Sequence, residues 1–253
     1  MSRSVVISGA AEGIGLAMAR LFAEAGDRVA MLDFNAARLD AAVADLAEDG
    51  LDVFGHQTDV RQSSAVQAAF AEAVARHGGV DVAISNAGVY PNSPVVDLEE
   101  DEWDRVMDTN LKGTFLFCRA AARQMIAQGS GGKICTMASG ASRSARRGGA
   151  HYCASKAGVV LFSQALALEL AEHRINVNIV APGFVDVGDR PGVSAPYRAA
   201  ITQGIPWGRA GRAADIAQAV RWVCSAEADF LTGAYIPVDG GASAGRFFLP
   251  LST

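Results

Sequence analysis

Short runs of β-branched and other apolar residues alternate along this chain with longer segments in which Ala and Leu recur at helical spacing. The short runs are typical of buried strands, and the longer segments are typical of helices with one apolar face. Their regular alternation predicts strand–helix–strand units, in which helices cover both faces of a parallel sheet. We therefore expect the α/β class, with a doubly wound parallel sheet built from nearly the whole chain.

The predicted elements follow one another through short connections. Strands are expected at Ser4–Ser8, Arg28–Leu32, Val53–Gln57, Val80–Ser85, Lys133–Met137, Asn176–Val180 and Tyr235–Val238. Helices are expected at Gly13–Glu24, Ala36–Glu48, Ala65–Arg76, Glu100–Met125 and Tyr152–Ala171, and another begins near Ala214.

The stretch from Gly183 to Gly211 is the least regular part of the chain, because Gly, Pro and Arg interrupt both periods there. A long irregular segment in a compact α/β domain is usually a functional loop or an insertion. We expect this stretch to form a loop on the substrate side of the site.

The composition of the chain narrows the classes of protein to which it can belong. A chain of 253 residues that is 50% hydrophobic and 19% charged can bury the core of one large domain. The net charge of -5 and the scattered basic residues argue against a nucleic-acid partner. No apolar run reaches the roughly 18 to 20 residues that span a bilayer, and no secretory signal is recognisable. We therefore expect a cytoplasmic protein with no membrane partner.

The four cysteines lie far apart and form no CxxC pair; they are Cys118, Cys135, Cys153 and Cys224. Zinc sites and disulfide frameworks are recognised by closer or regular spacings. We expect no metal site, and reduced thiols that are mostly buried.

The segment that joins the first predicted strand to the first predicted helix carries Gly9, Glu12, Gly13 and Gly15. Glycines let the chain turn sharply and let backbone N–H groups approach a pyrophosphate, whose charge is favoured at a helix N-terminus. The spacing is GxxxGxG, which differs from the usual GxGxxG fingerprint of dinucleotide sites. The position of the glycines nevertheless predicts a nucleotide site.

Asp33 ends the second predicted strand about 20 residues after the glycine turn, where a carboxylate can accept both ribose hydroxyls of a nucleotide. The same carboxylate would repel a 2′-phosphate. Its neighbour Phe34 offers no cation to neutralise that phosphate, and Glu12 adds a second acid. These residues favour NAD over NADP as the cofactor.

Tyr152 and Lys156 are four residues apart at the start of a predicted helix, so their side chains lie on one face, one turn apart. A nearby ammonium favours the phenolate and can lower the pKa of a tyrosine by roughly 1 to 3 units from about 10. Tyr152 then becomes a plausible acid or base. Ser139 follows a buried-looking strand, and its hydroxyl could donate to the same substrate oxygen.

Taken in order, these motifs resemble the short-chain dehydrogenase/reductase family over essentially the full length of the chain, in the single-domain branch that has about this length. The resemblance implies one NAD-binding Rossmann domain over residues 1–253. The residues that carry it are Gly9, Gly13 and Gly15 for the glycine loop, Asn86-Ala87-Gly88 beside the central strand, the catalytic tetrad Asn110, Ser139, Tyr152 and Lys156, and the turn Pro182-Gly183.

The resemblance also implies a role for each catalytic residue. Ser139 would polarise the substrate oxygen and Tyr152 would exchange its proton with it. Lys156 would lower the tyrosine pKa and hold the nicotinamide ribose. Asn110 would keep a helix irregular around a water of the proton relay. The implied contacts to the cofactor come from Gly9, Glu12, Gly13, Ile14, Gly15, Asp33, Phe34, Asp59, Val60, Asn86, Ala87, Gly88, Tyr152, Lys156, Pro182, Gly183 and Val185, with Asp59 at the adenine ring.

Two positions depart from the family pattern. Ser85 stands where Asn often precedes Asn86-Ala87-Gly88, a change with little expected effect. Val187 stands where a Thr commonly follows the Pro-Gly turn and binds the carboxamide, so that contact must come from another group.

The expected function is that of an NAD(H)-dependent oxidoreductase that interconverts a secondary alcohol (a sugar, polyol or cyclic alcohol) and its ketone. Ser139, Tyr152 and Arg146 are the expected substrate contacts. Arg143, Arg146 and Arg147 lie near the reacting carbon by resemblance, where one of them could recognise an anionic or polyhydroxylated substrate. A solvated charge cluster is the alternative. For the whole chain, the alternatives are a catalytically silent NAD-binding regulator or scaffold and, within enzymes, an isomerase or dehydratase.

The C-terminal stretch Phe247–Leu251 is apolar for a tail, and an exposed stretch of this kind often marks a subunit contact. Together with the habit of the family, it predicts a homotetramer in which the tail closes a neighbouring active site.

Overall fold

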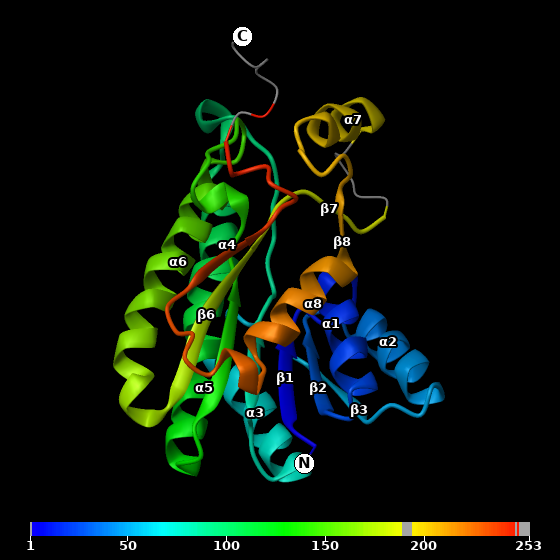
Figure 1. The fold of residues 1–253 in the computed structure, drawn as a ribbon, viewed down its shortest axis with the longest axis vertical. Coiled ribbons are helices and arrows are strands. Elements are labelled where there is room, and N and C mark those ends of the chain that lie inside the picture. Colours follow the sequence, from blue (N-terminus) through cyan, green and yellow to red (C-terminus); the bar gives the residue numbers. More distant parts are fainter. Residues whose placement is uncertain (1, 189–193, 246, 248–253) are drawn as a thin grey trace.

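The computed structural model describes residues 2–188, 194–245 and 247. Within these residues, seven parallel strands form one sheet in the order β3-β2-β1-β4-β5-β6-β9 (Figure 1). This sheet confirms the predicted α/β class. The strands are β1 (Ser4–Ser8), β2 (Arg28–Asp33), β3 (Val53–Gln57), β4 (Val82–Ser85), β5 (Gly132–Met137), β6 (Ile175–Pro182) and β9 (Tyr235–Val238).

Helices cover both faces of the sheet (Figure 1). Apolar residues of α1, α2 and α8 form the core on one face, and those of α3, α5 and α6 form the core on the other. The helices are α1 (Gly13–Glu24), α2 (Ala36–Glu48), α3 (Ser63–His77), α4 (Glu100–Met107), α5 (Gly113–Gln128), α6 (Ala150–Leu170), α7 (Ala195–Gln203) and α8 (Ala213–Val223).

Burial on both faces explains why the strands are apolar without a polar alternation. In β1, Val5 and Ile7 belong to the core under α1, whereas Val6 belongs to the opposite core, and all three are fully buried. Successive side chains of a strand point to opposite faces, so a strand covered twice needs apolar residues at every position.

The strand order reverses between β1 and β4, because the chain runs outward from β1 to β3 and then crosses back to β4. In open parallel sheets, ligands bind at such a switch point, beyond the carboxyl ends of the strands. The glycine turn after β1 lies at this place, and the residues after β4, β5 and β6 lie at the same edge of the sheet.

Two predicted segments differ from the structure. The stretch expected to be an irregular loop contains α7 and a short parallel pair, β7 (Val185–Asp186) with β8 (Gly211–Arg212). Ser194 begins α7 because its side chain accepts a hydrogen bond from the N–H of Tyr197, and a proline follows in the first turn. Figure 1 shows α7 beyond the carboxyl edge of the sheet.

The second difference lies in the long helix predicted at Glu100–Met125. A π-helical turn at Asp108–Lys112 separates α4 from α5. Such turns are rare and occur frequently at functional sites. The irregularity falls on Asn110, as the resemblance implies.

One helix in the described part of the chain, Ala150–His173, is long and apolar enough to cross a membrane by length and composition alone. The core helix of a folded domain passes the same test. This helix carries the buried Lys156 near its start and contacts β6.

All four cysteines are free. Cys118, Cys135 and Cys224 are buried and Cys153 is partly buried, which confirms the expectation that the thiols are mostly buried. Burial raises the pKa of the Cys118 thiol, so this group stays protonated.

Candidate active site

The glycine turn between β1 and α1 disfavours side chains at its glycines, through either backbone conformation or close approach of other atoms. Gly9 and Gly13 have φ values of 64° and 59°, which L side chains rarely adopt. A Cβ on Gly15 would lie 1.8 Å from the carbonyl oxygen of Gly9. Glu12 is the N-cap residue of α1 and makes no capping hydrogen bond with its side chain in the described structure. The first-turn N–H groups are therefore available to an anion such as a pyrophosphate.

Ser8 and Asn86 join this turn to the end of β4. The Asn86 side-chain amide donates to the carbonyl oxygens of Ser8 and Gly9, at 3.0 and 2.9 Å. The buried Ser8 hydroxyl accepts from the backbone N–H groups of Asn86 and Ala87, at 3.0 and 3.1 Å. The supporting role implied for Asn86 has a direct structural basis. Ser8 was missed from the sequence, although its signal was available: a small polar residue ends a buried strand just before Gly9.

Asp33 lies at the end of β2 beside the glycine turn. Its carboxylate accepts from the N–H of Ala11 at 3.1 Å and from the N–H of Asn35 at 2.9 Å. On α2, Arg38 donates to the Glu12 carboxylate at 2.8 Å, in an ion pair that is mostly exposed. Sequence reasoning missed this cation, because nothing along the chain links the two residues.

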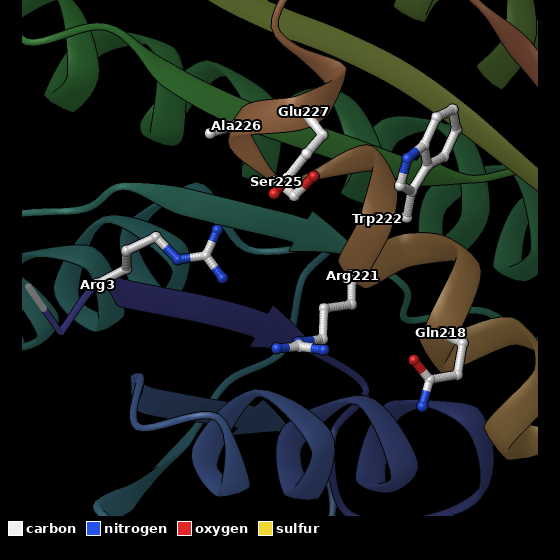
Figure 2. Close-up of a pocket in the computed structure, with 7 residues that line it drawn as sticks. All are labelled: Arg3, Gln218, Arg221, Trp222, Ser225, Ala226 and Glu227. Atoms are coloured by element: carbon white, nitrogen blue, oxygen red, sulfur yellow. The ribbon is translucent and has the colours of Figure 1, made fainter.

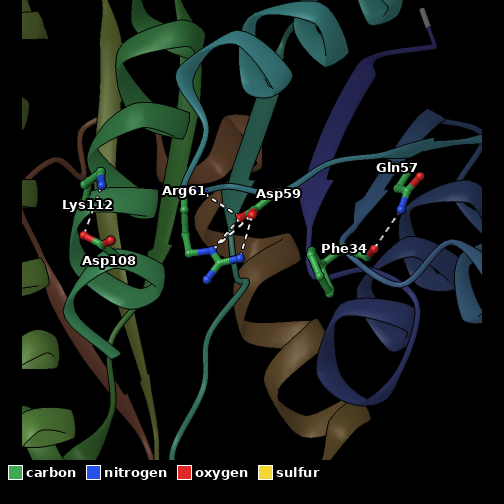
Figure 3. Close-up of polar contacts among 6 residues, drawn as sticks. All are labelled: Phe34, Gln57, Asp59, Arg61, Asp108 and Lys112. Atoms are coloured by element: carbon green, nitrogen blue, oxygen red, sulfur yellow. Dashed lines mark hydrogen bonds and ion pairs between the residues drawn. The ribbon is translucent and has the colours of Figure 1, made fainter. Parts of the chain in front are cut away.

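Asp59, predicted at the adenine ring, binds Arg61 (Figure 3). The Arg61 guanidinium donates to the two carboxylate oxygens at 2.9 and 2.7 Å, and this hydrogen bonding holds the pKa of Asp59 below its ordinary value. The same guanidinium lies 5.9 Å from the ring centre of Phe34, whose side chain is 65% exposed. Val60 is buried against Gly113. Asp59 and Phe34 thus share one cation, while the adenine contact stays a prediction.

Tyr152 and Lys156 lie one turn apart at the start of α6, as predicted. Lys156 is buried, and its Nζ donates to the carbonyl oxygen of Met137 at 2.8 Å. Burial lowers the pKa of Lys156 from 10.5 to about 8, so the ammonium persists at neutral pH. Nζ lies 6.0 Å from the centre of the Tyr152 ring. A positive charge at this distance favours the phenolate of Tyr152.

Asn110 is fully buried and connects the segment after β4 to α6. Its side chain accepts from the N–H of Val89 and donates to the carbonyl of the same residue, both at 2.8 Å, and it donates to the Ser155 hydroxyl at 3.2 Å. A Cβ on Gly88 would lie 3.2 Å from Asn110 Oδ1 and 3.5 Å from Lys156 Nζ. The structure therefore brings three of the predicted residues together.

Ser139 follows β5 and begins a short 3-10 helix, η3 (Gly140–Ser142), which packs against α6. Its Oγ accepts from the N–H of Ala141 at 3.2 Å. Its carbonyl oxygen accepts from the hydroxyls of Ser142 and Tyr235, at 2.7 and 3.4 Å. These bonds fix the Ser139 backbone beside the helix that carries Tyr152.

The turn after β6 is held against β9. The N–H of Gly183 donates to the carbonyl of Val238 at 3.0 Å, and a Cβ at Gly183 would lie 2.7 Å from the Cβ of Asp239. Pro182 and Val185 are buried. The Val187 side chain lies 3.8 Å from the position of a Cβ on Gly13. The residue that departs from the family pattern therefore covers the glycine turn with an apolar surface.

Two surface hollows lie apart from these residues. One of about 470 Å³ lies at the amino end of β1, where Arg3, just before β1, and Arg221 of α8 reach toward each other (Figure 2). Arg3 is already bound to Asp27 and to the carbonyl of Cys224, each at 2.7 Å. This hollow is at the opposite end of the strand from the glycine turn and holds none of the predicted site residues.

The second hollow, of about 590 Å³, lies against α7 and is lined in part by Ile205, Pro206 and Phe247. Phe247 is the first residue of the apolar tail singled out in the sequence. Residues 248–251 of that tail lie outside the described residues.

Known proteins resemble the chain along nearly its whole length. A family model described as enoyl-(acyl carrier protein) reductase matches residues 9–243. The chain is 36% identical to a sorbitol dehydrogenase of Cereibacter sphaeroides over 250 residues, which cover 94% of this chain and 96% of that one. It is also 36% identical to the 3-oxoacyl-(acyl-carrier-protein) reductase FabG of Staphylococcus aureus over 242 residues, which cover 95% and 98% of the two chains.

A solved short-chain type dehydrogenase/reductase from Mycobacterium marinum has the same fold, with a TM-score of 0.90 and 35% identity over 96% of both chains. The fold and the family resemblance predicted from the motifs are thereby confirmed. This chain is an oxidoreductase of the short-chain dehydrogenase/reductase family, whose members act on alcohol or ketone groups with a nicotinamide cofactor.

Proposed function

We propose that the protein interconverts a secondary alcohol of the sugar, polyol or cyclic type and its ketone, with NAD(H) as the hydride carrier. The observation that carries this proposal is the pairing of Tyr152 with the buried, protonated Lys156 at the carboxyl edge of the sheet. Such a pair supplies the proton donor or acceptor that carbonyl reduction and alcohol oxidation require.

Each catalytic side chain has a distinct task in this proposal. The Ser139 hydroxyl donates a hydrogen bond to the substrate oxygen. Tyr152 gives its phenolic proton to that oxygen in reduction and takes it back in oxidation, while the Lys156 ammonium stabilises the phenolate. Asn110 fixes the segment around Val89 that faces Lys156. The bound nicotinamide supplies or accepts the hydride.

The residues at the switch point fit a dinucleotide. The glycine turn would offer backbone N–H groups to the pyrophosphate at the start of α1, and Cβ atoms at Gly9 and Gly15 would clash with the protein itself and disrupt this turn. Asp33 would accept from the ribose hydroxyls and Asp59 would face the adenine. On the reactive side, the cofactor would contact Gly88, and further contacts would come from Ile14, Val60, Pro182, Gly183 and Val185.

Charge at the end of β2 supports NAD rather than NADP. The Asp33 carboxylate would face a 2′-phosphate directly, and like charges at this distance repel strongly. The nearby cation, Arg38, is paired with Glu12 in this structure. A 2′-phosphate would therefore meet one carboxylate and compete with another for the guanidinium.

Replacement of Asp33 by Asn is expected to lower the ratio of kcat/KM for NAD over NADP by at least about tenfold, since it removes the repelling charge with little change of shape. Adding Glu12→Gln should lower the ratio further, because Arg38 becomes available to the phosphate. The exposed acid Asp40 on α2 provides the control, and Asp40→Asn should leave the ratio unchanged. An unchanged ratio in Asp33→Asn would exclude this basis for cofactor choice.

The substrate class is supported by the similarity to a sorbitol dehydrogenase. A second candidate, reduction of a 3-oxoacyl thioester, is favoured by an equal identity to FabG. Absorbance of reduced nicotinamide distinguishes them, when alditols, sugars, cyclic alcohols, ketones and acetoacetyl thioesters are tested with both cofactors. Turnover of alditols or cyclic alcohols with NAD supports the proposal, whereas turnover restricted to the thioesters would replace it with the second candidate.

Assembly and location are extensions of the same proposal. We infer a cytoplasmic location and a homotetramer; the assembly is supported by the apolar residues Leu161 and Leu168 on α6, which are 68% and 82% exposed. Mass photometry tests the assembly, and a species of monomer mass at working concentration would exclude it.

A further inference from the structure

We infer that Arg146 binds a carboxylate of the substrate, so that the reacting alcohol or ketone belongs to a hydroxy acid or an oxo acid. This inference rests on the proposed function, because it names the substrate class of the same site. Three observations carry it: where Arg146 lies, what its guanidinium lacks, and how the backbone makes room for it.

Arg146 lies beside the reacting tyrosine. It belongs to the connection between η3 and α6, and its guanidinium carbon is 5.3 Å from the centre of the Tyr152 ring. Tyr90, from the segment after β4, packs edge-on against the same ring with the centres 6.4 Å apart. A substrate whose oxygen reaches Tyr152 therefore comes close to the Arg146 cation.

The guanidinium has no acceptor in the part of the chain that the structure describes. Its Nε is buried without a hydrogen-bond partner, and no described carboxylate or carbonyl forms a hydrogen bond or ion pair with its terminal nitrogens. A buried donor without an acceptor is costly, and charged groups cost more than neutral ones. By contrast, the Arg61 guanidinium donates hydrogen bonds to both carboxylate oxygens of Asp59. The unpaired charge of Arg146 is thus complementary to an anion.

The backbone is shaped to hold this side chain in place. The N–H of Gly149 donates to the carbonyl of Arg146 at 3.2 Å and closes a turn. A Cβ on Gly149 would lie 2.8 Å from both Cγ and Nε of Arg146, so only glycine lets the side chain fold back over this turn. The carbonyl of Gly148 accepts from the N–H of Ser93 at 2.9 Å, which ties the turn to the segment after β4.

The neighbouring arginines do not share these features. Arg143 stacks on the ring of Tyr235 in β9, with its guanidinium carbon 3.6 Å from the ring centre. Arg147 is exposed to solvent. Arg146 is therefore the member of the cluster that the structure directs to the substrate.

A carboxylate suits this cation better than a hydroxyl does. The planar guanidinium presents parallel N–H groups that match the two oxygens of a carboxylate, and charge-assisted bonds of this kind are about twice as strong as neutral ones. Loss of one such interaction corresponds to about a 10- to 100-fold change in affinity. We expect the enzyme to prefer an acid over the matched polyol by a factor in this range.

The test compares matched substrates that differ only at one terminal carbon. Aldonates of four to six carbons, such as gluconate, are assayed beside the corresponding alditols, such as sorbitol, with the full-length protein and NAD. The expected result is a higher kcat/KM for at least one acid than for its alditol. Arg146→Met should raise the KM for that acid by about 10- to 100-fold and lower the kcat/KM for the acid by at least about tenfold more than the kcat/KM for the alditol.

Two further variants make the result specific. Arg147→Met removes an exposed arginine from the same turn and should leave kcat/KM unchanged for both substrates. Arg146→Lys keeps the charge without the planar fork, and should restore part of the acid preference. An equal loss of kcat/KM for acid and alditol in Arg146→Met would overturn the inference, because it would mean that Arg146 supports Tyr152 and does not bind a carboxylate. Absence of any acid preference in the wild type would overturn it as well.

Thermal shift measurements separate this inference from the proposed function, since they need no turnover. Stabilisation of the NADH-loaded protein by an aldonate but not by its alditol, lost in Arg146→Met, supports the carboxylate site even if no substrate is turned over. Turnover of alditols without any shift by acids would uphold the proposed function and overturn the carboxylate site.

Discussion

Tyr152→Phe should lower turnover by about 10²- to 10⁴-fold, the range typical of losing a positioned proton donor, while binding of reduced nicotinamide stays within about twofold. The reason is that phenylalanine keeps the ring against Tyr90 and Arg146 and removes only the hydroxyl. Steady-state rates and fluorescence titration of NADH, measured on the same preparation, check both halves of this result.

The chain offers a matched control in the same site. Tyr90→Phe removes a hydroxyl from the ring that packs edge-on against Tyr152, and its activity should stay within about threefold of the wild type. If Tyr152→Phe kept more than a tenth of the wild-type rate, or if Tyr90→Phe lost as much, the proton transfer would have to be assigned elsewhere.

Lys156→Met should have opposite effects on activity and stability. Activity should fall by at least about 100-fold, because the phenolate of Tyr152 loses its cation. Stability without cofactor should rise by up to about 3 kcal/mol at neutral pH, since lowering a pKa from 10.5 to about 8 reflects the cost of burying the ammonium. The lost hydrogen bond to Met137 makes this value an upper limit.

The pH dependence of the free energy of unfolding tests this cost of burying the Lys156 ammonium. Between pH 8 and 10.5 the unfolded chain holds the Lys156 proton and the folded chain has released it, so wild-type stability gains from this group as the pH rises through that window. Urea unfolding across the window should show this gain in the wild type and not in Lys156→Met. Lys112→Met is the control, because Lys112 lies at the surface in a pair with Asp108 (Figure 3). Parallel curves for all three proteins would contradict the prediction.

Local patterns were enough to predict most of the fold. The bounds of α1 and α2 were predicted from apolar spacing and from the breaks at their ends, and β1 was predicted from its continuous apolar run. Each of these signals lies within a few residues, so no knowledge of the packing was needed. The glycine turn was predictable for the same reason, because its meaning follows from its place between a strand and a helix.

Features that depend on contacts between distant segments were not predicted. The pair of Arg38 with Glu12 joins α2 to the residue that precedes α1, and the support of the turn by Ser8 involves Asn86, which follows β4. Helix α7 was missed for a different reason, since its capping serine, Ser194, stands in a stretch whose glycines and prolines obscure the helical period. The roles of the site residues remain predictions until the variants above are measured.

The π turn at Asp108–Lys112 makes this part of the chain sensitive to length rather than to composition. A π turn holds one residue more than an α turn, and each residue rotates a helix by about 100°. Deleting a residue here would restore an ordinary α turn that keeps Val106, Phe117 and Met125 on their buried faces, but it would move Asn110 out of the position in which it binds Val89. Insertions and deletions within this turn should therefore be excluded among functional relatives even where its side chains vary.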